Sequence, residues 1–491
     1  MGLNTPANIL FTHSYFYPLD EKQWKNKTPY PPLGTITAAA YMRQLGHHVD
    51  LFDTNLRDSS AGLKPYLKEG LDFLVVYDDG FNYLTKMCLT TMREAAFEMI
   101  QMAAEKGIKV LVSSSDSTDH FEKYLDAGAT AVILGEGEET LKEAVDQLNA
   151  GEALNETIAG LAYREDGKTI RTAPRKVMKD LDALPIAAWD LVDVEAYRKV
   201  WNEGKYPFSL NIATTRGCPF KCNWCAKPIY GNRYNTRSPE HVVQEIEYLM
   251  AHFGVNRYWM CDDIFGLKPG WVKQFNKVLK EKNIRIEYKI QSRADLLVKD
   301  NTIEALAESG LYEVWIGAES GSQKILDAMD KGTTLEQIKT STDKLQELGV
   351  SVAYFIQFGY LGETKADIDL TLNMIRDNQP DDIGVSVSYP LPGTPFYDKV
   401  KQDLGNKANW SDSDDLAMMF QGTFNTEYYK TLHRYLHKRY RADQGIRYLK
   451  SLFSPASKKA INWRTLAAMP LNEVRSLQYA NQLKKLNNRA E

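Results

Sequence analysis

The sequence predicts an α/β protein with a doubly wound, Rossmann-like first domain, a partial (β/α)6 barrel and a helical C-terminal region. Two observations lead to this prediction. Strand-length apolar runs alternate with helix-length amphipathic segments, first over residues 1–150 and again over residues 201–400. The chain has 491 residues, enough for about three domains, and its 27 Tyr, 18 Phe and 9 Trp indicate packed cores rather than disorder.

The first domain is expected to span residues 1–150. Alternating strands and helices imply a parallel sheet, whose ligands bind beyond the carboxyl ends of the strands. The expected strands are 8–12, 48–53, 71–77, 109–113 and 131–134, and the expected helices are 35–45, 89–104 and 138–148. Candidate binding residues follow the ends of these strands: Asp78, Ser113, Ser115, Gly135 and Glu136.

A connector over residues 151–200 is expected to lead into the second domain, residues 201–400. The first helix of this domain has the clearest limits, because Ser238 can cap it, Pro239 suits its first position and Gly254 can end it. Six strand–helix units match an open barrel, whose chemistry lies at the carboxyl face. The expected strands are 210–214, 257–261, 285–290, 313–316, 352–357 and 383–388.

Residues 401–491 are expected to form helices and loops, and they carry a net charge of +8 against −12 for residues 1–400. This basic region is either a solvated helical tail or a face for an anionic substrate or a membrane surface. The whole chain has a charge of −4, which does not indicate a nucleic-acid partner. No apolar stretch is long enough to span a bilayer and the N-terminus lacks a signal-peptide pattern, so we expect a cytoplasmic protein.

Three of the five cysteines form the pattern C-x3-C-x2-C at Cys218, Cys222 and Cys225. Five cysteines are too few for a disulfide framework and fit a reducing compartment. Three thiolates on one loop can hold three corners of a 4Fe–4S cluster and leave the fourth iron open for a substrate. A structural zinc site is the alternative; it needs a fourth ligand, for which His241 and His252 on the following helix are the nearest candidates.

This pattern, with Trp224 before the last cysteine, resembles the signature of radical S-adenosylmethionine (SAM) enzymes. Further motifs of that superfamily follow the other expected strands of the barrel. They are Cys-Asp-Asp-Ile-Phe at 261–265, Ser-Arg-Ala-Asp at 292–295, Gly-Ala-Glu-Ser-Gly-Ser at 317–322, Phe-Gly-Tyr-Leu-Gly-Glu-Thr at 358–364 and Tyr-Pro-Leu-Pro-Gly-Thr-Pro at 389–395.

The first domain and the connector extend the resemblance to the subclass that has a cobalamin-binding domain. The relevant segments are Pro-Pro-Leu-Gly at 31–34, Gly-Glu-Gly-Glu-Glu-Thr at 135–140, and the stretch from Leu-Pro at 184–185 to Trp-Asp at 189–190. The nearest groups are the anaerobic magnesium-protoporphyrin ester cyclases and the hopanoid-modifying enzymes. The resemblance covers residues 8–400 and only faintly the region beyond them.

The resemblance implies three cofactors: a 4Fe–4S cluster on Cys218, Cys222 and Cys225, SAM on its open iron, and cobalamin at the first domain. Several of the proposed SAM contacts have a structural alternative. Asp262 and Asp263 match the residues that contact the methionyl amine; alternatively, they cap a helix. Glu319 matches the residue that contacts the ribose or the methionyl group. Arg293 pairs with the methionyl carboxylate or, alternatively, with Asp295 or Glu319. Gly359 and Gly362 let the backbone approach the adenine, and Trp224 flanks the adenine or simply packs.

The first domain departs from the family pattern in two places. No Asp-x-His-x-x-Gly motif, which supplies a histidine to cobalt, is found, so cobalt would be ligated from below by water, another side chain or nothing. The run from Ser113 to Asp116 replaces a glycine-rich turn. A domain that no longer binds cobalamin is therefore an alternative.

The resemblance implies an enzyme that cleaves SAM to a 5′-deoxyadenosyl radical and methylates an unactivated carbon of an unknown substrate. The alternatives are a cobalamin-assisted cyclisation or rearrangement and a non-catalytic iron–sulfur or cobalamin-binding regulator. A methylthiotransferase is rejected, since it needs three more cysteines and only Cys88 precedes Cys218. The expected partners are a flavodoxin- or ferredoxin-type electron donor and a small or lipid-like substrate, with the aromatic, basic stretch 428–448 as a candidate cap.

Overall fold

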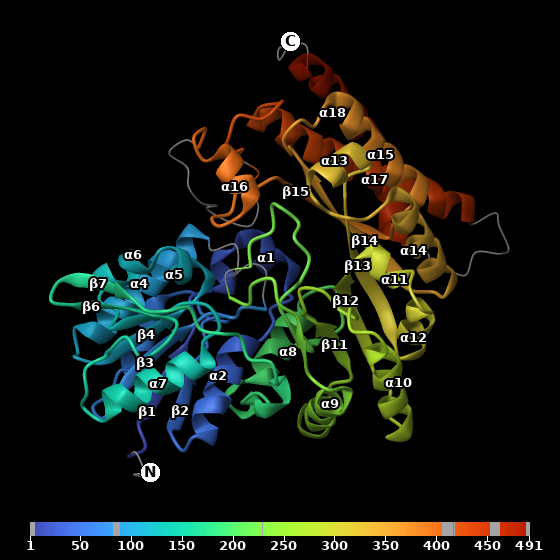
Figure 1. Cartoon of the computed structure of the whole chain (residues 1–491). Helices are drawn as coiled ribbons and strands as arrows, with labels where there is room; N and C mark the ends of the chain where they lie inside the picture. The colour runs from blue at the N-terminus through green and yellow to red at the C-terminus, as the bar shows by residue number, and fades with distance from the viewer. Residues whose placement is uncertain are drawn as a thin grey trace.

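The computed structural model describes residues 5–81, 89–227, 229–404, 416, 418–451 and 462–487. Two sheets lie side by side, the first in blue and cyan and the second in green to orange (Figure 1). Both are built mainly from parallel strands, which confirms the predicted fold class. Cys88 lies outside the described residues.

The first sheet has the order β2-β1-β3-β4-β5-β6-β7. Its parallel strands are β1 (Asn8–Thr12), β2 (His48–Phe52), β3 (Phe73–Tyr77), β4 (Lys109–Ser113) and β5 (Ala131–Ile133). An antiparallel hairpin, β6 (Leu161–Glu165) and β7 (Lys168–Arg171), extends it within the segment expected as a connector. Its helices are α1 (Glu21–Asn26), α2 (Leu33–Gln44), α4 (Thr90–Ala104), α5 (Ser115–Asp119), α6 (Phe121–Asp126) and α7 (Glu138–Asn149).

Alternating side chains explain why helices cover both faces of this sheet. Along β3, Phe73 and Val75 pack into the core shared with α2 and α7, whereas Leu74 and Val76 pack into the core shared with α4 and α6. All five residues of β3 are buried, as a central parallel strand requires. The carboxyl ends of the strands therefore remain as the edge at which a ligand can bind.

The second sheet has the order β15-β14-β13-β12-β11-β8, so its strands lie in the order of the chain, as in a partial barrel. The strands are β8 (Leu210–Ile212), β11 (Arg257–Met260), β12 (Glu287–Ser292), β13 (Leu311–Glu319), β14 (Ser351–Phe358) and β15 (Asp382–Val387). Each expected strand is confirmed with limits shifted by a few residues. The helices between them are α9 (Pro239–Phe253), α10 (Trp271–Glu281), α11 (Ala294–Leu297), α12 (Thr302–Glu308), α13 (Gln323–Ala328), α14 (Leu335–Glu347) and α15 (Lys365–Asn378).

Helix α9 has the predicted limits. The Ser238 side chain accepts a hydrogen bond from the backbone N–H of His241, and Pro239 occupies the first turn. Gly254 ends the helix at φ +63°, a left-handed conformation that glycine adopts without strain.

Three further parts of the chain complete the fold. Helix α8 (Val194–Asn202) lies between the two sheets, and a two-stranded ribbon, β9 (Thr215–Arg216) with β10 (Asn235–Thr236), follows β8. After α16 (Pro395–Val400), the long helices α17 (Thr426–Ser451) and α18 (Trp463–Asn487) pack together as a hairpin beside α15 (Figure 1). None of the described helices is long and apolar enough to cross a membrane.

Candidate active site

The three clustered cysteines lie on one loop that begins directly after β9. Gly217 starts this loop at φ +80°, and a Cβ atom there would collide with the carbonyl oxygen of Arg233. Only glycine therefore fits at the turn that directs the chain from β9 into the cysteine loop. None of the three thiols, Cys218, Cys222 and Cys225, forms a disulfide, and all three are half-buried.

Asn223 fixes the middle of the cysteine loop to the barrel. Its side-chain amide donates to the carbonyl oxygen of Ala328 at 2.7 Å and to Asp330 at 2.9 Å, while its Oδ1 accepts from the Tyr360 hydroxyl at 2.6 Å. Its backbone N–H donates to the carbonyl oxygen of Met329 at 3.0 Å. The loop between the second and third cysteines is therefore held to α13 and to the end of β14. Sequence reasoning did not single out Asn223, although it stands inside the cysteine motif.

A fourth ligand, which a structural zinc site would need, is not evident in the described part of the chain. In the described ranges, no three His, Cys, Asp or Glu side chains converge as one ion would require. His241 Nδ1 lies 3.2 Å from Asp182, and His252 Nδ1 lies 2.9 Å from the carbonyl oxygen of Tyr248. Both histidines are thus engaged elsewhere, which disfavours the zinc alternative. An iron–sulfur cube separates its ligands over different corners and fits a loop of this kind.

Burial keeps the thiols of Cys218 and Cys225 protonated in the absence of iron. It raises the pKa of Cys225 to about 11 and also raises the pKa of Cys218; in both cases the charge of Lys227 acts in the opposite direction and that of Asp263 in the same direction. Bound iron replaces these protons, because metals bind cysteine as the thiolate.

Asp262 and Asp263 lie next to each other but have different environments. Asp262 is fully buried and accepts hydrogen bonds from the backbone N–H groups of Thr214 at 2.7 Å and Thr215 at 2.8 Å, and burial raises its pKa to about 7. It therefore holds the bend between β8 and β9. Asp263 is exposed, and its charge acts on Cys218 and Cys225. Of the two, Asp263 has the environment of a ligand-binding residue.

Arg293 and Glu319 are buried beside the cysteine loop and each already has a protein partner. Arg293 donates to Asp295 at 2.9 Å, to the carbonyl oxygen of Lys331 at 2.6 Å and to Cys222 Sγ at 3.7 Å, and its guanidinium lies 3.7 Å from the ring centre of Phe220. The structural pair with Asp295 is thus formed. Arg293 also brings a positive charge to the thiols.

Glu319 stands at a backbone irregularity at the end of β13, with φ +56°. Its carboxylate accepts from Lys331 Nζ at 2.7 Å, and both side chains are buried. Lys331 was missed by sequence reasoning because it lies in a turn beyond α13 with no motif around it. A ligand that binds Glu319 also meets the charge of Lys331.

The two glycines after β14 have different surroundings. Gly359 has φ +78°, and a Cβ atom there would lie 3.2 Å from the Met418 side chain, so the C-terminal region covers it. Gly362 has φ +77° with no atom within 4 Å of a Cβ position. Trp224 packs in a cluster with Phe396, and in the described part of the chain its indole nitrogen is buried without a hydrogen-bond partner. The expected adenine contacts of these residues remain predictions.

The candidate cobalamin residues lie at the carboxyl edge of the first sheet, facing the barrel. A small pocket, about 10 Å³ in volume, is lined by Asp78, Ser113 and Ser115 from this edge and by Ile229 and Tyr230 from the chain after the cysteines. The backbone N–H and hydroxyl of Ser14 donate to Asp78 at 2.7 and 2.9 Å, and burial raises the pKa of this aspartate. The small serines permit close approach of a flat ring. This volume is far below the range of about 300–1,000 Å³ for drug-sized ligands, so cobalamin would fit only if Ile229 and Tyr230 moved away.

Glu136, another candidate for the cobalamin face, is bound to the barrel domain. Arg216, in β9, donates to Glu136 at 2.7 Å and to Glu138 at 2.6 and 3.1 Å, and all three side chains are buried. The guanidinium also lies 5.2 Å from the ring centre of Tyr230. Arg216 and Tyr230 were not singled out from the sequence, although Arg216 stands only two residues before Cys218. The cysteine loop is thus attached to the first domain by a buried ion pair.

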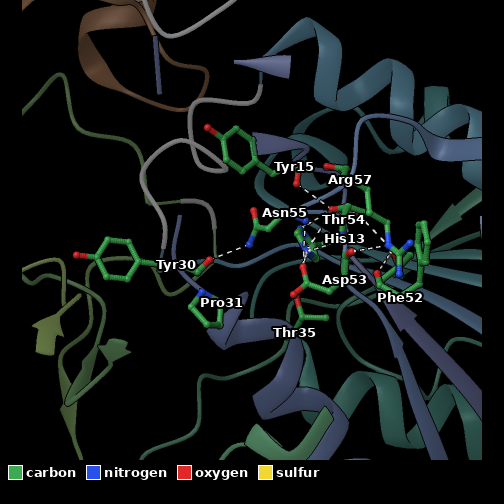
Figure 2. A network of polar contacts seen from close by, with 12 residues as sticks. His13, Tyr15, Tyr30, Pro31, Thr35, Phe52, Asp53, Thr54, Asn55 and Arg57 are labelled. Carbon is green, nitrogen blue, oxygen red and sulfur yellow. Dashed lines mark hydrogen bonds and ion pairs between the residues drawn. The ribbon is translucent and has the colours of Figure 1, made fainter. Parts of the chain in front are cut away.

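A histidine does lie at the carboxyl edge of the first sheet, within a polar network that Figure 2 shows. His13 Nε2 is 3.0 Å from Asp53 Oδ1, and the Tyr197 hydroxyl donates to Asp53 Oδ2 at 2.6 Å. Burial raises the pKa of Asp53, but the hydrogen bond and charge of His13 outweigh it, so the pKa is lowered. His13 also lies 3.0 Å from the Thr54 hydroxyl (Figure 2). These contacts tie β1 and β2 to α8.

Comparisons with known proteins agree with the site. Residues 212–375 match the family model of the radical SAM superfamily, so the chain carries a radical SAM domain. An uncharacterized methyltransferase of Pyrococcus horikoshii is 29% identical over 282 residues, covering 57% of this chain and 60% of that protein. The anaerobic magnesium-protoporphyrin IX monomethyl ester cyclase of Rubrivivax gelatinosus is 28% identical over 285 residues, covering 56% of this chain and 49% of the cyclase.

The fold of nearly the whole chain is also that of a solved protein. The cobalamin-dependent SAM radical enzyme OxsB, solved with aqua-cobalamin bound, aligns with a TM-score of 0.72 at 18% identity, covering 97% of this chain and 72% of OxsB. The likeness shows that both domains have the fold of a cobalamin-dependent radical SAM enzyme. The predicted family resemblance is thereby confirmed, whereas the individual site residues remain predictions. The chain matches only about half to three-fifths of the length of the two sequence relatives.

Proposed function

We propose that the protein is a radical SAM enzyme that methylates an unactivated carbon with the help of cobalamin. The observation that carries the proposal is the cysteine loop: three half-buried thiols at the carboxyl face of a partial barrel, joined by a buried ion pair to the edge of the first sheet. The relative named as a methyltransferase and the fold of a cobalamin-dependent enzyme support it.

Cys218, Cys222 and Cys225 would hold a 4Fe–4S cluster, which supplies the electron that cleaves SAM to a 5′-deoxyadenosyl radical. The chain's own residues position the reactants. Asn223 and Gly217 fix the loop, while Asp263, exposed beside the thiols, has the charge to bind the methionyl ammonium group. The C-terminal segment around Met418 covers the turn after β14 and limits the access of water there.

Cobalamin would lie at the edge formed by Asp78, Ser113, Ser115 and Gly135, where it would supply the methyl group. Glu136 would take part only through its pair with Arg216. Because His13 is held by Asp53 and Thr54, we expect no cobalt ligand from that side chain.

A cobalamin-assisted cyclisation without methyl transfer is the second candidate, favoured by the relative named as a cyclase. The external electron donor of flavodoxin or ferredoxin type, the small or lipid-like substrate and the cytoplasmic location also belong to the proposal. The proposal also includes the division of the chain into a first domain at 1–150, a connector at 151–200, a barrel at 201–400 and a helical region at 401–491.

Anaerobic purification with iron reconstitution, followed by iron and cobalt analysis, tests the proposal. We expect about four irons per chain, lost when Cys218, Cys222 and Cys225 are changed to Ala, and about one cobalt after incubation with cobalamin. Cys261→Ala is the matched control, since Cys261 is a buried thiol outside the loop that donates to the carbonyl oxygen of Ile212 at 3.4 Å. Reductive SAM cleavage by the loaded protein is then measured.

The outcomes separate the candidates. Iron binding without cobalt binding would support a radical SAM enzyme that does not use cobalamin. Consumption of methylcobalamin in the presence of substrate would distinguish methyl transfer from cyclisation. Cluster and cobalamin binding without SAM cleavage would leave the non-catalytic regulator. An iron content unaffected by the triple substitution would overturn the central assignment.

A further inference from the structure

Helix α18 exposes a row of large apolar side chains. Trp463 is 65% exposed, Leu471 53%, Val474 54% and Leu477 57%. At about 100° per residue, these four side chains lie within a sector of about 120° of the helix surface. Such a contiguous apolar row on one helix differs from the single exposed apolar residues that any protein surface carries.

The opposite face of α18 packs on α17, and the residues there are unusual for a core. Asn472 and Ser476 are buried in this interface, together with Leu483. Gly445 of α17 allows a close approach, because a Cβ atom there would lie 2.6 Å from the Met469 side chain. Thus α18 buries Asn472 and Ser476 beside Leu483 and Met469 against the protein, while four of its large apolar side chains point outward, which departs from the pattern of an ordinary surface helix.

Basic residues border the apolar row. Arg464 and Arg475 lie along one side, Lys484 on the other, and Lys485 beyond its end, and all four are exposed. The acidic residue of this helix, Glu473, is paired with Arg439 of α17 at 2.7 Å. The outer face of α18 is therefore apolar in the middle and positive at its borders.

We propose that the outer face of α18 docks on an anionic lipid surface, with Trp463, Leu471, Val474 and Leu477 entering the headgroup boundary. Apolar burial and attraction to anionic headgroups act together on such helices, and neither alone holds a protein firmly. The charge distribution favours this orientation: residues 401–491 carry a net charge of +8, whereas residues 1–400 carry −12 and would be repelled from an anionic surface.

A second copy of the chain is disfavoured as the occupant. A symmetric dimer through this face would place α18 against α18, and each carries four basic side chains and one acidic one. An anionic surface complements that charge, whereas self-association opposes it. The inference is independent of the reaction proposed above, and its test does not use catalysis.

The test is co-sedimentation of the full chain with vesicles of phosphatidylcholine alone and of phosphatidylcholine mixed with phosphatidylglycerol. We expect binding to the anionic vesicles that weakens with salt, and little binding to the neutral ones. Arg464→Gln with Arg475→Gln should weaken binding about 30-fold, from about fivefold for each charge. Leu471→Gln with Leu477→Gln should weaken it at least tenfold.

The matched control is Lys273→Gln with Lys277→Gln, which removes two exposed charges from α10. It should leave binding within about twofold, since those charges lie on another helix. Thermal unfolding and iron content verify that every variant is folded. Equal binding to both vesicle types, an equal effect of the control, or a dimer that the Leu471→Gln/Leu477→Gln variant dissociates would each overturn the proposal.

Discussion

Arg216→Met should destabilise the protein by about 3–5 kcal/mol, because it leaves two carboxylates buried without their cation. Arg216 is 4% exposed and is the cation between Glu136 and Glu138, at 2.7 and 2.6 Å. Methionine keeps most of the side-chain volume, so the loss reports charge rather than a cavity. The free energy of unfolding is measured by urea denaturation of the full chain.

The deficit should depend on pH with a defined sign. Burial raises the pKa of Glu136, and Arg216 partly offsets this. Without Arg216 the pKa of Glu136 rises further. The loss of folding free energy is therefore complete above the pKa that Glu136 has in the folded variant, and it disappears as Glu136 is protonated on acidification. The deficit of Arg216→Met should therefore be largest near pH 8 and shrink toward pH 5.

Two further variants make this reasoning refutable. Combining Arg216→Met with Glu136→Gln and Glu138→Gln should recover most of the stability, because no buried charge remains. Arg164→Met removes an exposed arginine paired with Asp126 and should cost no more than about 1 kcal/mol. A deficit as small as that of Arg164→Met, or one that is constant between pH 5 and pH 8, would refute the buried ion-pair account.

Three more predictions concern the cysteine loop and the bend between β8 and β9 that leads into it. Gly217→Ala should lower the iron content severalfold, because the loop cannot turn, whereas Gly231→Ala, at φ +62° with nothing within 4 Å of its Cβ, should retain it; equal losses would contradict the steric argument. Asn223→Leu should cost about 2–4 kcal/mol in urea denaturation and Tyr360→Phe about 1 kcal/mol, since the second removes a single hydroxyl, shared between Asn223 Oδ1 and the carbonyl oxygen of Ala328. The reverse order would exclude Asn223 as the anchor. Burial raises the pKa of Asp262 to about 7, so the folded state holds this proton after the unfolded chain has lost it. The free energy of unfolding should therefore fall by about 4 kcal/mol as pH rises from about 4 to 7. Asp262→Asn should flatten that part of the stability profile, and an unchanged profile would contradict this account.

The sequence predicts most strands well because they are short, largely apolar runs. The expected strand 109–113 is β4 without change, and 352–357 is β14 to within one residue at each end. The hairpin β6–β7 was not expected, because the last two residues of β6 and the first and last residues of β7 are exposed, so neither strand is a continuous buried run. Strand β7, at the edge of the sheet, has no continuous apolar run to reveal it.

Within the site, the cysteine loop was predictable because its ligands are close together in sequence. The residue pairs that hold the loop in place were not predictable. Arg216 meets Glu138, 78 residues away, and Asn223 meets Tyr360, 137 residues away. Such partners are chosen by the tertiary fold, and no local pattern marks them. The two neighbours Asp262 and Asp263 show the same limit, since only the fold decides that one is buried and the other exposed.

The adjacency of Arg216, Gly217 and Cys218 has a mechanical consequence. One residue anchors β9 in the neighbouring domain, the next makes a turn that only glycine can make, and the third is a candidate cluster ligand. Two peptide bonds therefore fix the separation between the iron-binding loop and the edge of the first sheet. Any tilt of one domain relative to the other would pull directly on Cys218, so insertion of iron would stiffen the whole molecule and its loss would loosen it.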